Sequence, residues 1–184
     1  MATFYAIGRR ALALVLVLGF SPVVNLHASE PAREGELKAA FLLNFARFAE
    51  WPVDVVPAGG PLTFCVLGDW FVARSLEAAA QGKTIDGHSL IVTRIRDDSA
   101  LRSCQILYAG RVDKTRALEL LRVVEGVAVL TVSDLETFTE IGGTATFLID
   151  ENRMRFFVNM EAARRSRVQL SSQLLRLATL VTSK

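Results

Sequence analysis

The chain has 184 residues, of which 51% are hydrophobic, and it carries 21 Lys and Arg residues against 19 Asp and Glu residues. The net charge of +2 is too small for the basic footprint of a nucleic-acid-binding domain, so we predict no nucleic-acid partner. Residues 29–184 are enough for one domain with one good core, and we predict a single domain over that range.

The N-terminal segment, residues 1–28, has the three-part pattern of a secretory signal peptide. Its first part carries Arg9 and Arg10 and no acid, an unbroken apolar run follows over 11–20, and a looser tail ends at Ala28. We predict cleavage after Ala28 and export of the mature chain. A membrane anchor is the alternative, but this apolar run is far shorter than the roughly 20 residues that span a bilayer. Cleavage would leave 19 basic against 19 acidic residues, so the mature chain would be near neutral.

Apolar runs that alternate with helical patterns indicate an α/β fold. The runs 62–67 and 127–132 are apolar almost throughout, which is typical of strands buried on both faces. This alternation predicts a mainly parallel sheet flanked by helices. The predicted elements, in chain order, are helix 34–50, strand 62–67, helix 70–81, strand 89–95, strand 104–109, helix 114–125 and strand 127–132.

The last forty residues add a hairpin and terminal helices to this pattern. Two β-prone runs, 144–149 and 154–159, are separated by four turn residues and predict a β-hairpin. Good helix formers follow directly over 160–165. The segment 173–181 is predicted as a further helix, because its apolar residues repeat at helical spacing and Ser171 or Ser172 precedes it as an N-cap; the repeating residues are Leu174, Leu177, Ala178 and Val181.

Residues that could carry chemistry are few. His88 is the only histidine after residue 28, and it follows the turn pair Asp86-Gly87. A solvated turn residue is the favoured interpretation, with a proton shuttle as the alternative. The sequence contains none of the glycine-rich phosphate loops or nucleophile motifs of common enzymes. We therefore predict no enzymatic activity, no metal site and no cofactor.

Asp69 and Asp134 each follow a predicted strand. Open α/β sheets bind ligands beyond the carboxyl ends of their strands, so these two carboxylates are candidate ligand-binding residues. Aspartate is also a common helix N-cap, and capping is the favoured alternative.

The two cysteines, Cys65 and Cys104, lie in the first predicted strand and at the start of the third. In an exported protein an isolated pair is interpreted as a disulfide, and neighbouring strands would bring the two residues close enough. Two buried thiols and a reactive redox pair are the alternatives.

Aromatic residues and arginines provide candidate contacts for a partner. Phe41 and Phe48 lie on one predicted stripe of helix 34–50 with Leu37 and Phe45, and Trp51 follows. This is more aromatic surface than one core face usually needs, so part of it is a candidate contact with a partner protein or a second copy of the chain. Packing of these side chains in the core is the favoured alternative. Four arginines near the hairpin–helix junction either pair with an acidic partner or form a solvated basic face; they are Arg155, Arg164, Arg165 and Arg167.

Residues 36–181 resemble the YfiR/HmsC-type family of small periplasmic proteins. Each matching segment is short, but the segments occur in order over nearly the whole mature chain. They are residues 38–52, 64–68, 104–108 and 129–134, Gly142-Gly143 with 150–152, and then 156–165 and 170–178.

The resemblance implies a periplasmic α/β domain without known catalytic activity. It further implies a repressor that binds the periplasmic sensor region of an inner-membrane diguanylate cyclase and lowers cyclic-di-GMP output, exopolysaccharide and biofilm formation. An OmpA-like outer-membrane lipoprotein is the implied sequestering partner. Some relatives carry a second cysteine pair that this sequence lacks, so redox switching through that pair does not carry over. A periplasmic small-ligand receptor that uses Asp69 and Asp134 is the alternative function.

Overall fold

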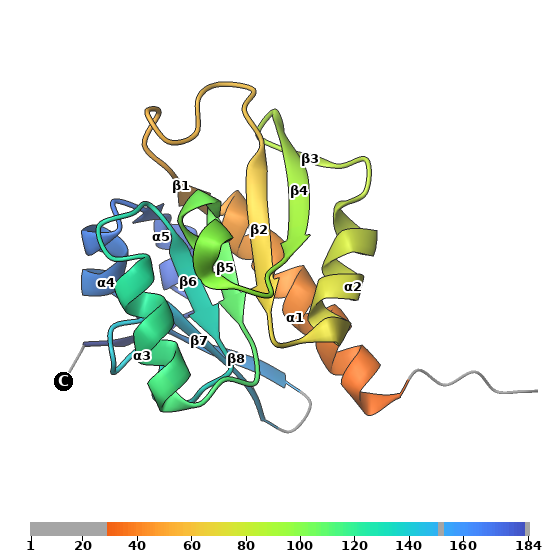
Figure 1. The fold of residues 1–184 in the computed structure, drawn as a ribbon, viewed down its shortest axis with the longest axis vertical. Helices are drawn as coiled ribbons and strands as arrows, with labels where there is room; N and C mark the ends of the chain where they lie inside the picture. Colours follow the sequence, from red (N-terminus) through yellow and green to blue (C-terminus); the bar gives the residue numbers. More distant parts are fainter. Residues whose placement is uncertain (1–28, 151–152, 183–184) are drawn as a thin grey trace, which may run out of the picture.

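The computed structural model describes residues 29–150 and 153–182, so the signal peptide predicted over 1–28 lies outside the described residues. Eight strands form one sheet in the order β10-β8-β7-β6-β5-β2-β4-β3 (Figure 1). The central run from β4 to β7 is parallel, whereas β3 and β8 are antiparallel to their neighbours β4 and β7. The mainly parallel sheet is therefore confirmed. The strands are β2 (Leu62–Leu67), β3 (Thr84–Ile85), β4 (His88–Arg94), β5 (Ile106–Ala109), β6 (Leu130–Ser133), β7 (Ala145–Asp150), β8 (Arg153–Asn159) and β10 (Thr179–Val181).

Helices cover both faces of this sheet. Helices α1 (Glu30–Arg47) and α2 (Trp70–Ala80) lie on one face, and α3 (Lys114–Val123) lies on the other with the 3-10 helix η1 (Asp98–Ser103) (Figure 1). Successive residues of a strand point to opposite faces. In β2, Phe64 and Val66 therefore enter the larger core under α1 and α2, while Cys65 enters a smaller core under α3.

The strand order reverses between β2 and β5. The chain passes from β2 to β4 on one side and later adds β5 and β6 on the other side. Such a reversal point is where open α/β sheets place ligands, beyond the carboxyl ends of the strands. Gly68 and Gly110 follow these two strands, and Gly68 has a φ of 78°. A β-carbon at Gly68 would collide with the carbonyl oxygen of Gly110, so the close approach requires glycine.

The predicted hairpin is present as β7 and β8, with Phe147 opposite Phe156. These two rings meet the rings of Phe41 and Phe45 from α1 in edge-to-face contacts, with centroids 5.1 Å apart for Phe45–Phe147 and 5.9 Å apart for Phe41–Phe156. Aromatic rings favour this geometry. The hairpin thus supplies the packing partner for much of the aromatic surface of α1.

The predicted stripe of α1 is confirmed only in part, because Phe41, Phe45 and Phe48 contact the larger core but most of the fully buried residues of the helix lie elsewhere. Of the four stripe residues only Phe45 is fully buried, while Phe41 and Phe48 are half-buried. The helix also ends at Arg47, and Ala49–Glu50 instead forms the short strand β1, which pairs with β9 (Gln169–Leu170) in a separate two-stranded sheet. The inward face of α1 is shifted by one position along the sequence, and its buried residues are Gly35, Lys38, Ala39, Leu42, Phe45 and Ala46.

The predicted C-terminal helix over 173–181 is wrong. After α4 (Met160–Arg165) and β9, the chain makes only the single-turn helix α5 (Ser172–Leu175), and β10 then runs parallel to β8. The hydroxyl of Ser171 accepts from the Leu174 amide at 3.3 Å, so the predicted N-cap at Ser171 is confirmed. Leu177 and Leu180 are 74% and 56% exposed, so the apolar spacing in this segment does not mark a buried helix face.

Candidate interaction site

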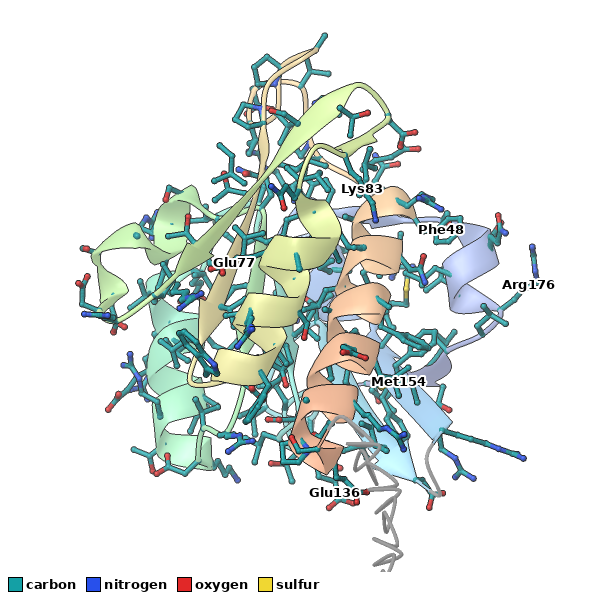
Figure 2. The ribbon with its side chains drawn as sticks, turned by 90° about the vertical axis from the view of Figure 1, so that its right-hand side faces the viewer. Phe48, Glu77, Lys83, Glu136, Met154 and Arg176 are labelled. Carbon is teal, nitrogen blue, oxygen red and sulfur yellow. A yellow bond between two sulfur atoms is a disulfide. The ribbon has the colours of Figure 1, made fainter. Side chains whose placement is uncertain are left out.

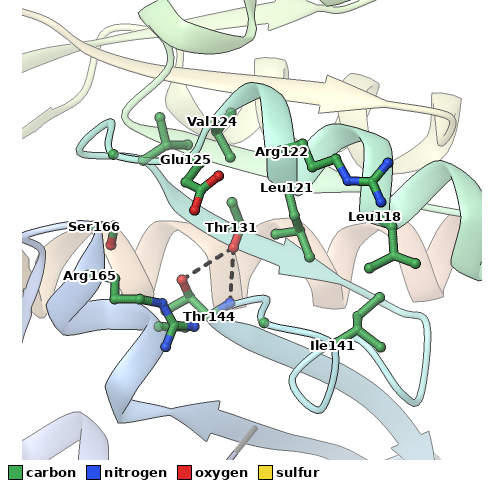
Figure 3. Close-up of a pocket in the computed structure, with 14 residues that line it drawn as sticks. Leu118, Leu121, Arg122, Val124, Glu125, Thr131, Ile141, Thr144, Arg165 and Ser166 are labelled. Atoms are coloured by element: carbon green, nitrogen blue, oxygen red, sulfur yellow. Dashed lines mark hydrogen bonds between the residues drawn. The ribbon is translucent and has the colours of Figure 1, made fainter. Parts of the chain in front are cut away.

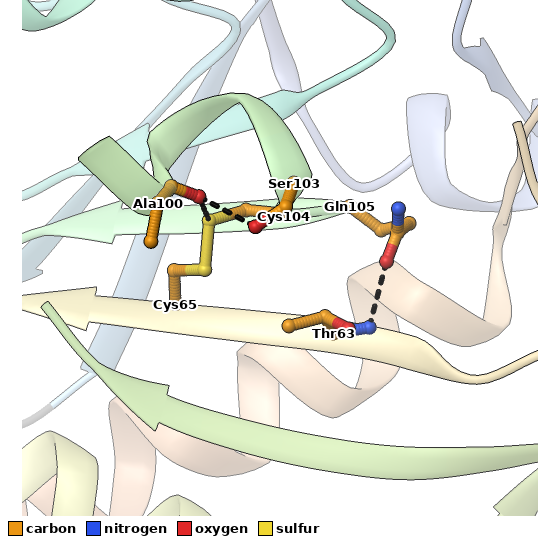
Figure 4. The surroundings of a disulfide bond; sticks show 6 residues. All are labelled: Thr63, Cys65, Ala100, Ser103, Cys104 and Gln105. Atoms are coloured by element: carbon orange, nitrogen blue, oxygen red, sulfur yellow. Dashed lines mark hydrogen bonds between the residues drawn. A yellow bond between two sulfur atoms is a disulfide. The ribbon is translucent and has the colours of Figure 1, made fainter. Parts of the chain in front are cut away.

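The predicted disulfide is present and buried in the smaller core. Cys65 of β2 and Cys104 lie 39 residues apart in the sequence with their Cα atoms 5.8 Å apart (Figure 4). Cys104 follows η1 and precedes β5, rather than beginning the strand as predicted. Next to it, the side-chain oxygen Oε1 of Gln105 accepts a hydrogen bond from the Thr63 amide at 2.9 Å. The disulfide therefore fixes the end of η1 to strand β2 of the sheet.

A polar cluster, which we call the strand-end cluster, lies at the carboxyl ends of β5 and β6. Asp134 follows β6, and its Oδ2 lies 2.7 Å from Nζ of Lys38 and accepts from the Tyr108 hydroxyl at 3.0 Å. Its Oδ1 accepts from the Arg111 amide at 2.9 Å. Lys38 also pairs with Glu34 at 2.5 Å, one turn earlier in α1. The cluster thus joins the first helix to two central strands.

Both members of the central ion pair are charged over a wide pH range. Burial alone would lower the pKa of Lys38, but the hydrogen bonds and charges of Asp134 and Glu34 outweigh it and raise the pKa above 10.5. Burial likewise acts to raise the pKa of Asp134, but its hydrogen bond with Lys38 and its further partners lower the pKa below 3.8. The pKa of Tyr108 is raised well above its usual value, first by burial and then by the nearby carboxylates.

Asp69, the other predicted ligand-binding residue, caps α2. One carboxylate oxygen accepts from the amides of Phe71 and Val72 at 3.0 Å and 3.2 Å. The other oxygen lies 3.6 Å from Nε of Arg111. The capping interpretation is therefore confirmed for Asp69, whereas Asp134 acts through the strand-end cluster. Both carboxylates have partners inside the protein, and ligand binding by them stays a prediction.

A groove, which we call the Trp51 groove, lies between the segment that follows α1 and the helix α4. Its volume is about 510 Å³. The pairing of β1 with β9, which sets Ala49 opposite Leu170, holds the two sides together. Apolar side chains make up much of the wall, and charged groups stand among them. The lining residues are Glu50, Trp51, Pro52, Met160, Ala163, Arg164, Arg167, Val168, Gln169 and Leu170.

Two polar groups of the groove lack partners in the part of the chain that the structure describes. The indole Nε1 of Trp51 is buried and has no hydrogen-bond acceptor among the described residues. Arg164 is exposed and forms no ion pair within residues 29–150 and 153–182, whereas Arg167 contacts Asp54 at 3.2 Å. A buried donor without an acceptor costs free energy, and such a group calls for an explanation.

The structure brings only some of the predicted partner-binding residues together. Trp51 and Arg164 both line the groove. Phe48 is three residues before Trp51 at the C-terminal end of α1 (Figure 2), and it packs against the larger core. Arg165 lines a different cavity. Arg155 pairs with Asp150 of the hairpin at 3.1 Å. The predicted residues therefore fall on separate parts of the surface.

Sequence reasoning missed the strand-end cluster as a unit. Lys38 is 2% exposed, although lysine is rarely buried without a partner. One signal was available, because Glu34 precedes it by four residues on the same helix. Its second partner, Asp134, is 96 residues away, and no local pattern links the two.

Two features are absent from the residues that the structure describes. No group of His, Cys, Asp and Glu side chains there is arranged to hold a metal ion. Among the helices of residues 29–150 and 153–182, none is long and apolar enough to cross a membrane.

The fold and these sites define a small doubly wound α/β protein with surface cavities on both sides of α4. The chain belongs to the YfiR/HmsC-like family, whose model matches residues 35–179. The resemblance seen in the sequence is therefore confirmed. Membership in this family supports a regulatory role rather than a catalytic one.

Solved structures of low sequence identity are similar in fold. A conserved domain protein from Vibrio cholerae O1 biovar El Tor matches with a TM-score of 0.52 and 11% identity, over 79% of this chain and 59% of that chain. The present chain thus spans little more than half of that structure, and the likeness concerns the fold alone. An ABC domain from Streptococcus pneumonia in complex with L-Trp matches with a TM-score of 0.46 and 11% identity, over 82% of this chain and 60% of that chain.

Proposed function

We propose that this protein is a periplasmic repressor that binds the periplasmic sensor region of an inner-membrane diguanylate cyclase and lowers cyclic-di-GMP output. The family membership supports a regulatory role, and the Trp51 groove supplies a surface suited to protein contact. The observation that carries the proposal is that two donors in this groove, the Trp51 indole and the Arg164 guanidinium, lack partners among residues 29–150 and 153–182.

The unpaired indole N–H of Trp51 favours binding of a partner in the groove. Leaving a buried donor unpaired costs about 1–3 kcal/mol, so a bound state that supplies an acceptor recovers free energy that the isolated protein cannot. Nε1 itself is buried, so a partner can reach it only if the Trp51 ring rotates on binding. Trp and Arg are also the side chains that most often dominate protein interfaces.

The charge of the groove favours an acidic or carbonyl-rich segment of the partner. Arg164 projects from α4 without a counter-ion in the described structure, and an arginine can take a carboxylate through two hydrogen bonds. Met160, Ala163 and Leu170 supply the apolar wall beside it. The partner segment that fits is therefore an apolar one that carries an acidic residue next to its anchoring side chain.

Repression requires a difference in affinity between two states of the cyclase. The repressor must bind the inactive state of the sensor region more tightly than the active state. A coupling free energy of about 2–3 kcal/mol would change output roughly 30- to 150-fold. An OmpA-like lipoprotein that binds the same groove would then relieve repression by competition.

The test is calorimetric titration of the mature protein with the purified periplasmic region of the cyclase. Trp51→Phe keeps an aromatic ring and removes the N–H, and Arg164→Glu reverses the charge. Each should weaken binding about tenfold or more. Arg74→Glu is the matched control, because Arg74 is an exposed arginine on α2 that forms no ion pair in the described structure. Undiminished binding by both groove variants would remove the groove from the interface, and failure of the unmodified protein to bind would refute the function.

A further inference from the structure

A second cavity, of about 230 Å³, lies between α3 and α4 on the face of the sheet opposite α1 (Figure 3). Its floor is formed by the buried residues Thr131 and Thr144. The Thr144 amide donates to Oγ1 of Thr131 at 2.9 Å, and the two hydroxyls are 3.2 Å apart. The walls are mostly apolar, and their residues include Leu118, Leu121, Val124, Val129, Ile141 and Ala162.

Charges of opposite sign stand on the two sides of this cavity. Glu125, just after α3, and Arg165 of α4 point toward the two threonines from opposite sides (Figure 3). Glu125 has no ion-pair partner among the described residues. In the described part of the chain, Arg165 pairs with Glu161 of its own helix alone, at 3.3 Å, and both side chains are more than half exposed. Exposed pairs of this kind contribute little, so Arg165 can be redirected to a ligand at small cost.

The Arg165 side chain lies close to the loop that borders the cavity. Gly142 lies in that loop with a φ of 108°. A β-carbon at Gly142 would lie 3.8 Å from Nη2 of Arg165, so the guanidinium sits directly over the loop backbone and beside the Thr144 end of the floor. Arg122 lines the same cavity on the α3 side and, like Glu125, forms no ion pair in the described part of the chain.

We propose that this cavity binds a small zwitterion with an aliphatic side group, whose cationic end pairs with Glu125 and whose carboxylate pairs with Arg165. A purely anionic ligand would face Glu125, and a purely cationic ligand would face Arg165, so a molecule with both charges is matched on both sides. The Arg122 guanidinium points away from the two threonines, toward Leu118 (Figure 3). The apolar walls then receive the side group. The volume falls just below the roughly 300–1,000 Å³ of ordinary ligand pockets, which restricts the ligand to a small molecule.

This site goes beyond the proposed repressor function, because its occupation needs no partner protein. The test uses three probes of nearly equal size, titrated calorimetrically into the mature protein. L-leucine carries both charges, (S)-2-hydroxy-4-methylpentanoate lacks the cation, and L-leucinamide lacks the carboxylate. L-leucine should bind about tenfold or more tightly than either analogue, because each analogue forfeits one charged contact.

Two variants assign the charges to residues. Glu125→Gln should abolish the preference for L-leucine over (S)-2-hydroxy-4-methylpentanoate, and Arg165→Gln should abolish the preference for L-leucine over L-leucinamide. Glu119→Gln, an exposed change on α3 outside the cavity, should leave both preferences as they are. Equal affinity for the three probes, no binding of L-leucine, or unchanged preferences in both cavity variants would each overturn the proposal.

Discussion

Lys38 of α1 and Asp134 after β6 are 96 residues apart in the sequence, yet their charged atoms lie 2.7 Å apart inside the protein. Their side chains are 3% and 20% exposed, so water screens this pair little. The pair fastens the first helix to the carboxyl ends of the central strands. A buried pair of this kind is costly to break, because the remaining charge then has no counter-ion.

We expect Lys38→Met to destabilise the protein by about 3–5 kcal/mol, since it leaves Asp134 buried without its counter-ion. The double variant Lys38→Met with Asp134→Leu should regain much of this loss, because two apolar side chains can replace a buried pair at little net cost. Unfolding by urea measures both free energies. A double variant no more stable than the single one would show that Asp134 acts mainly through Tyr108 and Arg111.

The same pair predicts how stability depends on pH. The folded pKa of Asp134 lies below 3.8, so its contribution is complete above that pH and is lost as the pH falls through the folded pKa. The folded pKa of Lys38 lies above 10.5, so its contribution is complete below that pH and is lost as the pH rises through the folded pKa. Denaturant unfolding from acid to alkaline pH should show a plateau between these limits. Asp134→Asn should reduce the loss of stability at acid pH. If the loss is unchanged in this variant, other carboxylates cause it.

Removal of the disulfide should lower the stability of the fold without lowering the affinity of the Trp51 groove for its partner. Closing a loop with the 39-residue separation of Cys65 and Cys104 restricts the unfolded chain by about 4 kcal/mol in the entropy model. The double change of both cysteines to serine should therefore lower the midpoint of thermal unfolding. Partner titration below that midpoint should give an unchanged affinity, because the bond lies in the core under α3. A large loss of affinity in a still-folded variant would contradict this separation.

Trp51→Phe should change the stability of the protein and its affinity for the partner in different ways. It removes a buried donor that lacks an acceptor in the described structure, so the isolated protein should be as stable as the unmodified one or more stable. Its affinity for the cyclase region should nevertheless fall. Parallel unfolding and titration experiments give the two quantities. A variant that loses both together would show that the indole serves packing alone.

Deletion of the gene should raise cellular cyclic-di-GMP and surface attachment, because the cyclase then loses its repressor. The increase should disappear when the partner cyclase is removed as well. A complementing copy with Arg164→Glu should fail to restore repression, while a copy with Arg74→Glu should restore it. Unchanged cyclic-di-GMP in the deletion strain would argue for the small-ligand receptor instead.

The elements predicted correctly from the sequence are those in which the local residue pattern and the tertiary contacts favour the same structure. The strand Leu62–Leu67 and the hairpin follow from apolar runs bounded by turn residues, and both are confirmed. The disulfide was predicted because Cys65 and Cys104 are the only two cysteines in the sequence, and it is confirmed. These features need no knowledge of distant contacts.

The misplaced elements depend on contacts far along the chain. Residues 173–181 have helical apolar spacing, but pairing with β8 makes residues 179–181 a strand. The inward face of α1 is set by Asp134, which holds Lys38 inside, and by the hairpin rings that cover Phe41 from the side. Likewise, Trp51 and Arg164 meet in a groove only because β1 pairs with β9, two strands too short to be recognised in the sequence.

Strand β10 has a consequence for the behaviour of shortened chains. It covers the edge of β8 at Phe157, Val158 and Asn159, and it is only three residues long. Very short edge strands are one way in which proteins prevent their sheets from joining those of other molecules. A chain that stops before Thr179 would therefore present the backbone of β8 to its neighbours. Such a chain should aggregate at concentrations where the whole protein remains dispersed.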